Sequence, residues 1–440
     1  MPKLINNVIL NKIIAALFFF ILLIISFGQI GRIGFGSYPA YMYLYEIILV
    51  VFIVLLLPMV FNKNLIKTNR SILVFMTWLI LSLLVSMFWY WTFANIIAIL
   101  YALRLEAYFL YFILLKDYLQ KNSDVKPIFQ KGIYYFLALT IVYSFIQYFF
   151  YPNIGNIAYL GWDPHLYRMV GVFFEPQIAV GMYGLIFLYF FARDQNMLES
   201  ELASRLNVGT AHLFAHPRNA RAHSSFTRSN IHFLRNFNHS LVHRLFLLVV
   251  ITIMIVLTIS RGGIIAFVIT LLFIFRKKLK LILFGILIIL LVFITVPKPQ
   301  SEGLNLLRTS SIQTRIIDYQ KAIKIWLKSP IIGIGYNHIR FEKDLLEENL
   351  LVEKYNPSHA SSSFHSSFLI ILVTLGVIGL GLYLWVLWDL GKPGGFAFYS
   401  TLFLSLISIF DNVLLHPFIL FVYFSMIAIS QTTRPSHGSR

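Results

Sequence analysis

The sequence contains no cysteine and few charged residues, and both shortages narrow the range of functions. Without cysteine, disulfide bonds and thiolate chemistry are excluded. Only 12% of the residues are charged whereas 58% are hydrophobic, which excludes an ordinary soluble domain. The sequence also lacks a phosphate loop of the form G-x-x-x-x-G-K-[ST] and an outward Asp-x-Asp pair. Neither an ATP motor nor a carboxylate site for a metal-bound sugar phosphate is therefore expected, and no metal or cofactor is predicted.

Long apolar runs dominate the rest of the chain. Because a membrane-spanning helix needs about 20 apolar residues, hydropathy predicts an all-α, polytopic integral membrane helical bundle with about 12 transmembrane helices. The first run lacks a small-residue cleavage site, so we expect a retained signal anchor. The spans are expected near residues 13–31, 40–61, 72–91, 94–115, 132–151, 170–192, 245–260, 262–275, 279–296, 365–388, 396–411 and 413–430.

The excess of basic over acidic residues is concentrated in particular loops of this bundle. Lys and Arg number 36 against 18 Asp and Glu, and they concentrate in alternate loops. Such a positive-inside pattern predicts that the N and C termini and the basic loops are cytoplasmic, whereas the loops between the basic ones face outward. It also explains the net charge without nucleic acid, so no nucleic-acid partner is predicted. Basic residues of the inward loops include Lys3, Lys12, Lys63, Lys67, Arg70, Lys116, Lys121, Lys126 and Lys131.

Two polar segments and a short C-terminal tail divide the chain into six regions. The segment 193–243 is a basic, His-rich cytoplasmic loop whose histidines lack compact ligand spacing and acidic partners. We therefore expect it to rest on membrane lipid headgroups rather than to hold a metal. The segment 297–364 is an outward loop with short helices. The remaining regions are transmembrane helices 1–6 (1–192), helices 7–9 (244–296), helices 10–12 (365–430) and a cytoplasmic tail (431–440).

The outward loop contains a predicted amphipathic helix. Ser310 and Gln313 resemble a capping box at its start, and Ser329-Pro330 stops it. Gly333 and Gly335 form the following turn. Because several isoleucines share one helical face, the helix is expected to lie against the membrane-facing surface of the bundle. Arg315 is expected in its first turn, where a positive charge opposes the helix dipole, and this misfit favours a functional role.

Arg261 interrupts an apolar stretch and is the strongest candidate for anion binding. A charge near hydrocarbon costs a few kcal/mol, so such residues usually line a cavity or a water–lipid boundary. Gly262 and Gly263 follow it and leave backbone N–H groups accessible to an anion. The alternative is an arginine that extends to the interface from a tight helical hairpin.

His365 opens the next apolar run and is the candidate general base. A nearby serine is expected to cap the helix that follows. The positive end of the helix dipole favours a neutral imidazole, which can accept a proton. The alternatives are a histidine that only marks the interface, and His359 as the competing base.

Other charged residues near the spans have structural explanations of equal or greater weight. Glu175 stands in the first turn of the sixth span, where its charge suits the helix dipole, and Arg168 is available to pair with it or to bind an anion. Arg104 and Glu106 lie inside the fourth span and are not partners by spacing. Each is therefore expected to find a structural partner elsewhere in the bundle.

The order of these motifs resembles the shared domain of bacterial O-antigen ligases and O-antigen polymerases. The likeness covers roughly 245–390, and the span count extends it across most of the chain. One departure is Ser366, where the family often has asparagine after the histidine. The motifs are Ser260-Arg261-Gly262-Gly263, Arg315, Trp326-Leu327-Lys328-Ser329-Pro330, Gly333-Ile334-Gly335-Tyr336, His365-Ser366-Ser367-Phe368-Leu369 and Gly376-Val377-Ile378-Gly379.

The resemblance implies glycosyl transfer at the periplasmic face of a bacterial inner membrane, without nucleotide or metal. The donor would be a glycan linked to undecaprenyl pyrophosphate, and the acceptor a glycan or lipid A-core. Arg261 and Arg315 would bind the pyrophosphate, with His365 acting on the acceptor hydroxyl. Arg168, Glu175, Gly262, Gly263, Gly333 and Gly335 would contribute to substrate binding.

The resemblance leaves open which reaction of the family is catalysed. The Phe-Phe-Glu-Pro stretch at 173–176 favours a polymerase, for which a chain-length regulator is a candidate partner, over a ligase that transfers glycan to lipid A-core. A third member of the family glycosylates proteins. A lipid-linked glycan flippase is the rival from another class, but flippases need charges along a central path, and here the charges gather at the outer face.

Overall fold

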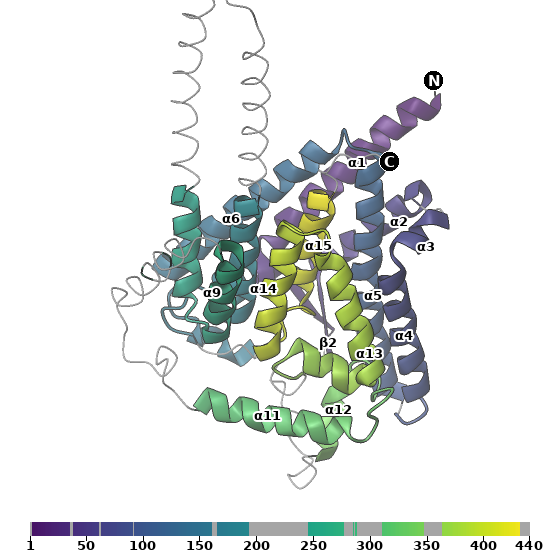
Figure 1. Cartoon of the computed structure of the whole chain (residues 1–440), viewed down its shortest axis with the longest axis vertical. Helices are drawn as coiled ribbons and strands as arrows, with labels where there is room; N and C mark the ends of the chain where they lie inside the picture. Colours follow the sequence, from purple (N-terminus) through teal and green to yellow (C-terminus); the bar gives the residue numbers. More distant parts are fainter. Residues whose placement is uncertain are drawn as a thin grey trace, which may run out of the picture.

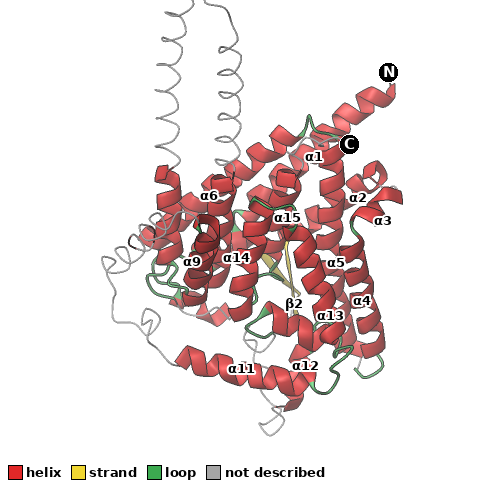
Figure 2. Ribbon diagram, viewed as in Figure 1, coloured by secondary structure: helices red, strands yellow, loops and turns green. Residues whose placement is uncertain are grey.

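The computed structural model describes residues 2–35, 38–60, 63–90, 92–160, 165–192, 245–276, 285, 287, 310–346 and 363–431. Helices dominate this part of the chain, and they gather into one bundle (Figures 1 and 2). The prediction of a helical membrane protein is confirmed at this level.

The N-terminal half carries helices and one β-hairpin. The chain runs through α1 (Pro2–Ile25), the 3-10 turn η1 (Gly28–Gly31), β1 (Arg32–Phe35), β2 (Tyr38–Tyr43), α2 (Leu44–Val60), α3 (Lys63–Thr68), α4 (Arg70–Ser86), α5 (Thr92–Lys121), α6 (Lys126–Phe150), η2 (Gly155–Leu160), η3 (Gly171–Phe173) and the helix Pro176–Ala192.

The described elements of the C-terminal half are all helices, joined by turns and loops. Its elements are the helix Leu245–Leu257, α9 (Arg261–Phe275), α11 (Ser310–Trp326), α12 (Ile339–Leu346), α13 (Ser367–Gly391), α14 (Phe396–Phe410) and α15 (Pro417–Gln431).

Four of the described helices are long and apolar enough to cross a membrane, so the expected number of about 12 spans is not confirmed. Seven further apolar helices are shorter, with 10–17 residues. The predicted span 279–296 and the basic loop 193–243 lie outside the described residues, apart from the isolated positions 285 and 287. The four long helices are Val8–Ile25, Ala94–Lys121, Lys126–Phe150 and Ser367–Gly391.

Helix α15 forms the centre of the bundle. Its residues from Phe418 to Ile429 are all buried, and it packs against α5, α6 and α14. A helix that is apolar on every side has no face for water, so burial within the bundle is the arrangement expected from its composition. Around it, α13 packs on α4 and α14, while α9 packs on α14.

The β-hairpin is a two-stranded exception within the helical bundle, and it corrects the predicted span 40–61. β1 and β2 pair antiparallel, with Arg32 opposite Tyr43. The helix α2 begins only at Leu44, where the Tyr43 N–H donates to Oε2 of Glu46 at 2.9 Å. The aromatic β2 residues continue directly into the apolar helix, so hydropathy merged two elements into one run.

Helix α13 is broken at Gly376, whose φ of 68° lies in the left-handed region. A neighbouring turn satisfies the backbone around the break. The Gly335 N–H donates to the Thr374 carbonyl at 2.9 Å, and the Val377 N–H donates to the Pro330 carbonyl at 3.0 Å. Irregular backbone is tolerated inside a membrane protein when other protein groups satisfy it in this way.

Helix α11 lies across the end of the bundle, opposite the end where α1 begins (Figure 1). The predicted helix at this position is confirmed, but its isoleucine face does not pack on the protein. Ile316 and Ile323 are exposed, whereas Ala322 and Ile325 are fully buried against the bundle. The exposed apolar stripe and neighbouring lysines are typical of a helix at a membrane surface.

Candidate active site

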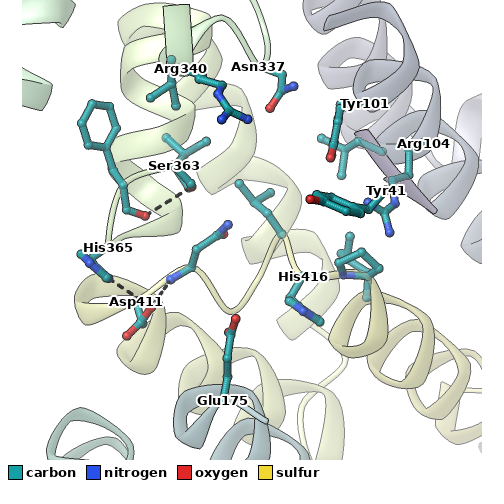
Figure 3. Close-up of a pocket in the computed structure, with 18 of the residues that line it drawn as sticks. Tyr41, Tyr101, Arg104, Glu175, Asn337, Arg340, Ser363, His365, Asp411 and His416 are labelled. Atoms are coloured by element: carbon teal, nitrogen blue, oxygen red, sulfur yellow. Dashed lines mark hydrogen bonds and ion pairs between the residues drawn. The ribbon is translucent and has the colours of Figure 1, made fainter. Parts of the chain in front are cut away.

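A cavity of about 360 Å³ lies where the two halves of the chain meet. Its walls come from the β-hairpin, α5, the start of the helix Pro176–Ala192, the segment 336–341, the segment 363–365 and the loop between α14 and α15. Figure 3 shows His365 and Asp411 at one side, and Tyr41, Tyr101 and Arg104 at the opposite side. Residues distant in sequence therefore share one polar pocket.

His365 stands immediately before α13 and lines this cavity. The helix begins after it because the Ser366 hydroxyl accepts a hydrogen bond from the Leu369 N–H at 3.4 Å, which confirms the predicted serine cap. The same hydroxyl donates to the Ser408 carbonyl at 3.0 Å. Ser366, where the family often has asparagine, thus fixes the start of α13 against α14.

Asp411 joins His365 to Arg315. Its Oδ1 lies 3.7 Å from Nδ1 of His365, and its Oδ2 accepts from Nη2 of Arg315 at 3.2 Å. Arg315 lies in the second turn of α11 rather than in the first. The structure therefore brings together two of the three predicted catalytic residues through a carboxylate that was not among the predicted site residues.

The Asp411 carboxylate raises the pKa of His365 above its ordinary value of 6.5. Burial acts in the opposite direction, Asp318 adds to the increase, and the Arg315 charge lowers the pKa slightly. The expectation of an imidazole kept neutral by the helix dipole is therefore wrong in sign. The carboxylate beside the ring stabilises the imidazolium more than burial destabilises it.

A buried ion pair holds the segment that carries His365. Lys343 of α12 donates to Oδ1 of Asp318 at 2.8 Å and to the Ser363 carbonyl at 2.6 Å. The other Asp318 oxygen accepts from the His365 backbone N–H at 2.8 Å. In addition, the Tyr319 hydroxyl is 3.3 Å from the His365 carbonyl. Helices α11 and α12 thus fix the backbone of the candidate base.

Arg261 begins α9 and does not belong to the described lining of the cavity. The next residue, Gly262, faces Phe410, the neighbour of Asp411, and a Cβ atom there would lie 3.1 Å from the Phe410 Cβ. Gly263 packs on Val180, and its N–H donates to the Ser260 hydroxyl at 3.4 Å. The two glycines therefore serve close helix packing, and the N–H of Gly263 already has an intramolecular acceptor.

Gly333 and Gly335 have a structural role as well. Both have positive φ, at 82° and 87°. A side chain at Gly333 would meet the backbone of Thr374, and one at Gly335 would meet Ser86. Neither glycine lines the described cavity, but the turn they form positions Tyr336 and Asn337, which do.

Of the two remaining predicted binding residues, Glu175 lies in the cavity wall and Arg168 does not. Glu175 lines the cavity at the start of the helix Pro176–Ala192. Arg168 is only 6% exposed and is not part of the described lining. Its carbonyl accepts from the Gln147 amide at 3.2 Å, so its backbone has a structural partner.

The second wall of the cavity was not predicted. Arg104 of α5 donates through Nε to Oε1 of Glu46 at 2.6 Å, which confirms that its partner lies elsewhere in the bundle. Tyr43 donates to Oε1 of Gln29 at 2.8 Å in the same region. A tyrosine-rich stretch before an apolar run was the available signal, but only the fold shows which of its members reach the pocket.

Among the described residues, no group of three or more His, Asp and Glu side chains is arranged to hold a metal ion.

Known proteins supply an independent comparison. No curated protein matches the sequence. Residues 246–384, however, match the family described as O-antigen ligase. This segment includes Arg261, Arg315 and His365, and the match supports the resemblance of this part of the chain to O-antigen ligases and polymerases.

Proposed function

We propose that the protein transfers a glycan from undecaprenyl pyrophosphate to a sugar hydroxyl at the periplasmic face of a bacterial inner membrane. The family supports glycosyl transfer of the ligase or polymerase type. The observation that carries the finer proposal is the contact of His365 and Arg315 with opposite oxygens of Asp411 at one wall of the cavity. A base, its orienting carboxylate and a cation for an anionic leaving group are thereby combined.

His365 acts on the acceptor in this proposal. Its imidazole takes the proton of the acceptor hydroxyl while that oxygen forms a bond to the anomeric carbon of the donor. The bond between this carbon and the pyrophosphate oxygen breaks, and undecaprenyl pyrophosphate leaves with the electron pair. Attack from the side opposite the leaving group inverts the anomeric configuration. Asp411 stabilises the imidazolium that results.

Arg315 and Arg261 act on the leaving group. Guanidinium groups bind phosphate oxygens through paired hydrogen bonds and stabilise the charge that develops on them. Arg315 already lies beside the candidate base, and the packing of Gly262 on Phe410 brings the start of α9 to the same end of α14. The proposal needs no metal to neutralise the pyrophosphate.

Orientation in the membrane is supported by two independent observations. The basic loops predict cytoplasmic termini. In Figure 1, α1 begins and α15 ends at one end of the bundle, whereas α11 and α12, which hold the candidate base, lie at the other. Together these observations support a periplasmic position for the acceptor site.

Polymerisation is the reaction we favour. Glu175, in the Phe-Phe-Glu-Pro stretch typical of polymerases, lines the cavity. Ligation to lipid A-core is the second candidate, and protein glycosylation uses the same chemistry. A flippase fits less well, because the contacts of Asp411 assemble a proton acceptor rather than a charged path through the bilayer.

A surface-glycan gel from a deletion strain tests this proposal. Core that carries a single repeat is expected, because ligation continues without polymerisation; bare core with polymer on the lipid carrier would instead indicate a ligase. Complementation with His365→Ala should fail to restore the wild-type ladder, whereas Lys324→Ala, an exposed cation on α11, should restore it. A full ladder with His365→Ala at normal protein level would overturn the mechanism.

A further inference from the structure

The wall opposite His365 contains two hydrogen-bond donors for which the described part of the chain offers no acceptor. Nε2 of Gln29 and Nη2 of Arg104 are buried, and neither has a hydrogen-bond partner among the described residues. Both residues line the cavity, and Gln29 is only 5% exposed. Buried donors are almost always satisfied in folded proteins, so two orphans in one pocket indicate a ligand with acceptor atoms.

The orientation of both donors is fixed by neighbours. The Tyr43 hydroxyl donates to the Gln29 oxygen at 2.8 Å, which leaves the amide nitrogen for another partner. Glu46 accepts from Nε of Arg104 at 2.6 Å and from the Tyr108 hydroxyl at 2.6 Å. Because these contacts hold each group by its other atoms, the wall is preorganised rather than flexible.

The charges of this wall favour a hydroxylated ligand over a phosphate. The Arg104 charge is already compensated by the adjacent Glu46 carboxylate. Tyrosine rings accompany the donors: the Arg104 guanidinium lies 5.7 Å from the Tyr101 ring centre, and Tyr101 lines the cavity. Amide and guanidinium donors beside aromatic rings suit a sugar, whose hydroxyl oxygens accept hydrogen bonds and whose C–H face packs on a ring.

We propose that Gln29, Tyr101 and Arg104 form a glycan subsite that binds a sugar unit away from the reacting bond. This inference rests on the proposed function and deepens it, since it assigns the far wall of the same cavity to substrate recognition. The subsite selects the sugar that occupies it, while His365 and Asp411 act on the hydroxyl at the opposite wall.

Binding to the purified full-length protein in nanodiscs tests the subsite. The probe is the repeat-unit oligosaccharide released by mild acid from the lipid carrier of a deletion strain, titrated by saturation-transfer NMR. Gln29→Met and Tyr101→Ala should each raise the Kd of this oligosaccharide about tenfold, the effect of one or two lost contacts. Tyr101→Phe, which keeps the ring, should stay within about threefold of wild type.

Three controls separate the outcomes. Tyr135→Ala, an exposed ring on α6, should bind as wild type, and the elution volume and Tm of each variant report folding. Undecaprenyl pyrophosphate without sugar is the second probe; if only its binding is lost, the wall binds pyrophosphate and the proposal is wrong. Unchanged oligosaccharide binding in both variants, or none in wild type, would also overturn it.

His365→Ala distinguishes this inference from the proposed function. It should lose transfer activity but keep oligosaccharide binding, because the subsite lies at the opposite wall. An active His365→Ala protein would refute the mechanism and leave the subsite standing, whereas wild-type binding by Gln29→Met and Tyr101→Ala would refute the subsite alone.

Discussion

Asp411 is in contact with two residues whose charges affect each other. It stabilises the protonated form of His365 and also pairs with Arg315. A general base must be neutral to accept a proton, so activity should rise as pH rises through the pKa of His365, which lies above 6.5. The two neighbours of His365 should therefore shift the pH profile in opposite directions.

Asp411→Asn should lower the pKa of His365, because the carboxylate that raises it is removed. The acidic limb of the kcat/KM profile should move to lower pH, and the maximal kcat should fall by about 10- to 100-fold, part of the effect typical of general-base catalysis. The measurement is a pH series with lipid-linked glycan. A limb that does not move would show that Asp411 does not set the protonation of the base.

Arg315→Ala should have the opposite effect on the pH profile. The Arg315 charge lowers the pKa of His365, so its removal should move the acidic limb to higher pH. If Arg315 also binds the pyrophosphate, KM for the donor should rise at every pH. Lys324→Ala is the matched control on the same helix. A shift to lower pH would contradict this electrostatic assignment.

At this scale, the residues that the sequence could identify were those with local signals. His365 became a candidate because it precedes an apolar run, and Arg261 because it interrupts one; the structure places His365, but not Arg261, in the lining of the cavity. Asp411 was not, because its partners are 46 and 96 residues away in the sequence. Its position at the junction of two apolar runs was the only hint, and many such carboxylates merely end a helix.

Helices α11 and α12 act together as a support for the candidate base. The Lys343–Asp318 pair is buried, and Asp318 also accepts from the His365 backbone. Asp318→Asn should leave Lys343 buried without a counter-charge and reduce stability by about 3–5 kcal/mol. The decrease is measurable as a lower Tm in nanodiscs.

A second ion pair provides the comparison. Lys328 pairs with Glu342 at 2.6 Å, but the lysine side chain is 47% exposed. The Glu342 carboxylate is buried but keeps the Tyr90 hydroxyl as a donor, so Lys328→Met should cost less than Asp318→Asn. Equal losses of Tm in the two variants would show that burial does not determine how much the Asp318 pair contributes to stability.

Elements with a clear periodic spacing of apolar residues were predictable. Elements whose apolar residues continue directly into the next element were not. The α11 helix follows from its amphipathic spacing, although the sequence could not show which face meets the protein. The β-hairpin was hidden, because β2 runs directly into α2. Broken helices such as α13 read as one apolar run, since the groups that satisfy the break come from a distant turn.

The whole molecule has an orientation that can be tested directly, because the chain has no cysteine to give a background. Ser123 lies between α5 and α6, and Lys324 lies on α11 at the opposite end of the bundle (Figure 1). In intact spheroplasts, a membrane-impermeant maleimide should label Lys324→Cys and not Ser123→Cys. Labelling of Ser123→Cys alone would invert the topology and remove the site from the periplasmic side.

The break in α13 also links the membrane to the cavity. The turn that fills the break carries Tyr336 and Asn337 into the pocket wall, and the Trp78 indole of α4 donates to the Leu375 carbonyl at 3.0 Å. Hydrogen bonds therefore connect the cavity wall, the turn and the helices α4 and α13. Since a membrane helix can tilt to match the thickness of the bilayer, this connection predicts that lipid chain length affects the shape of the cavity.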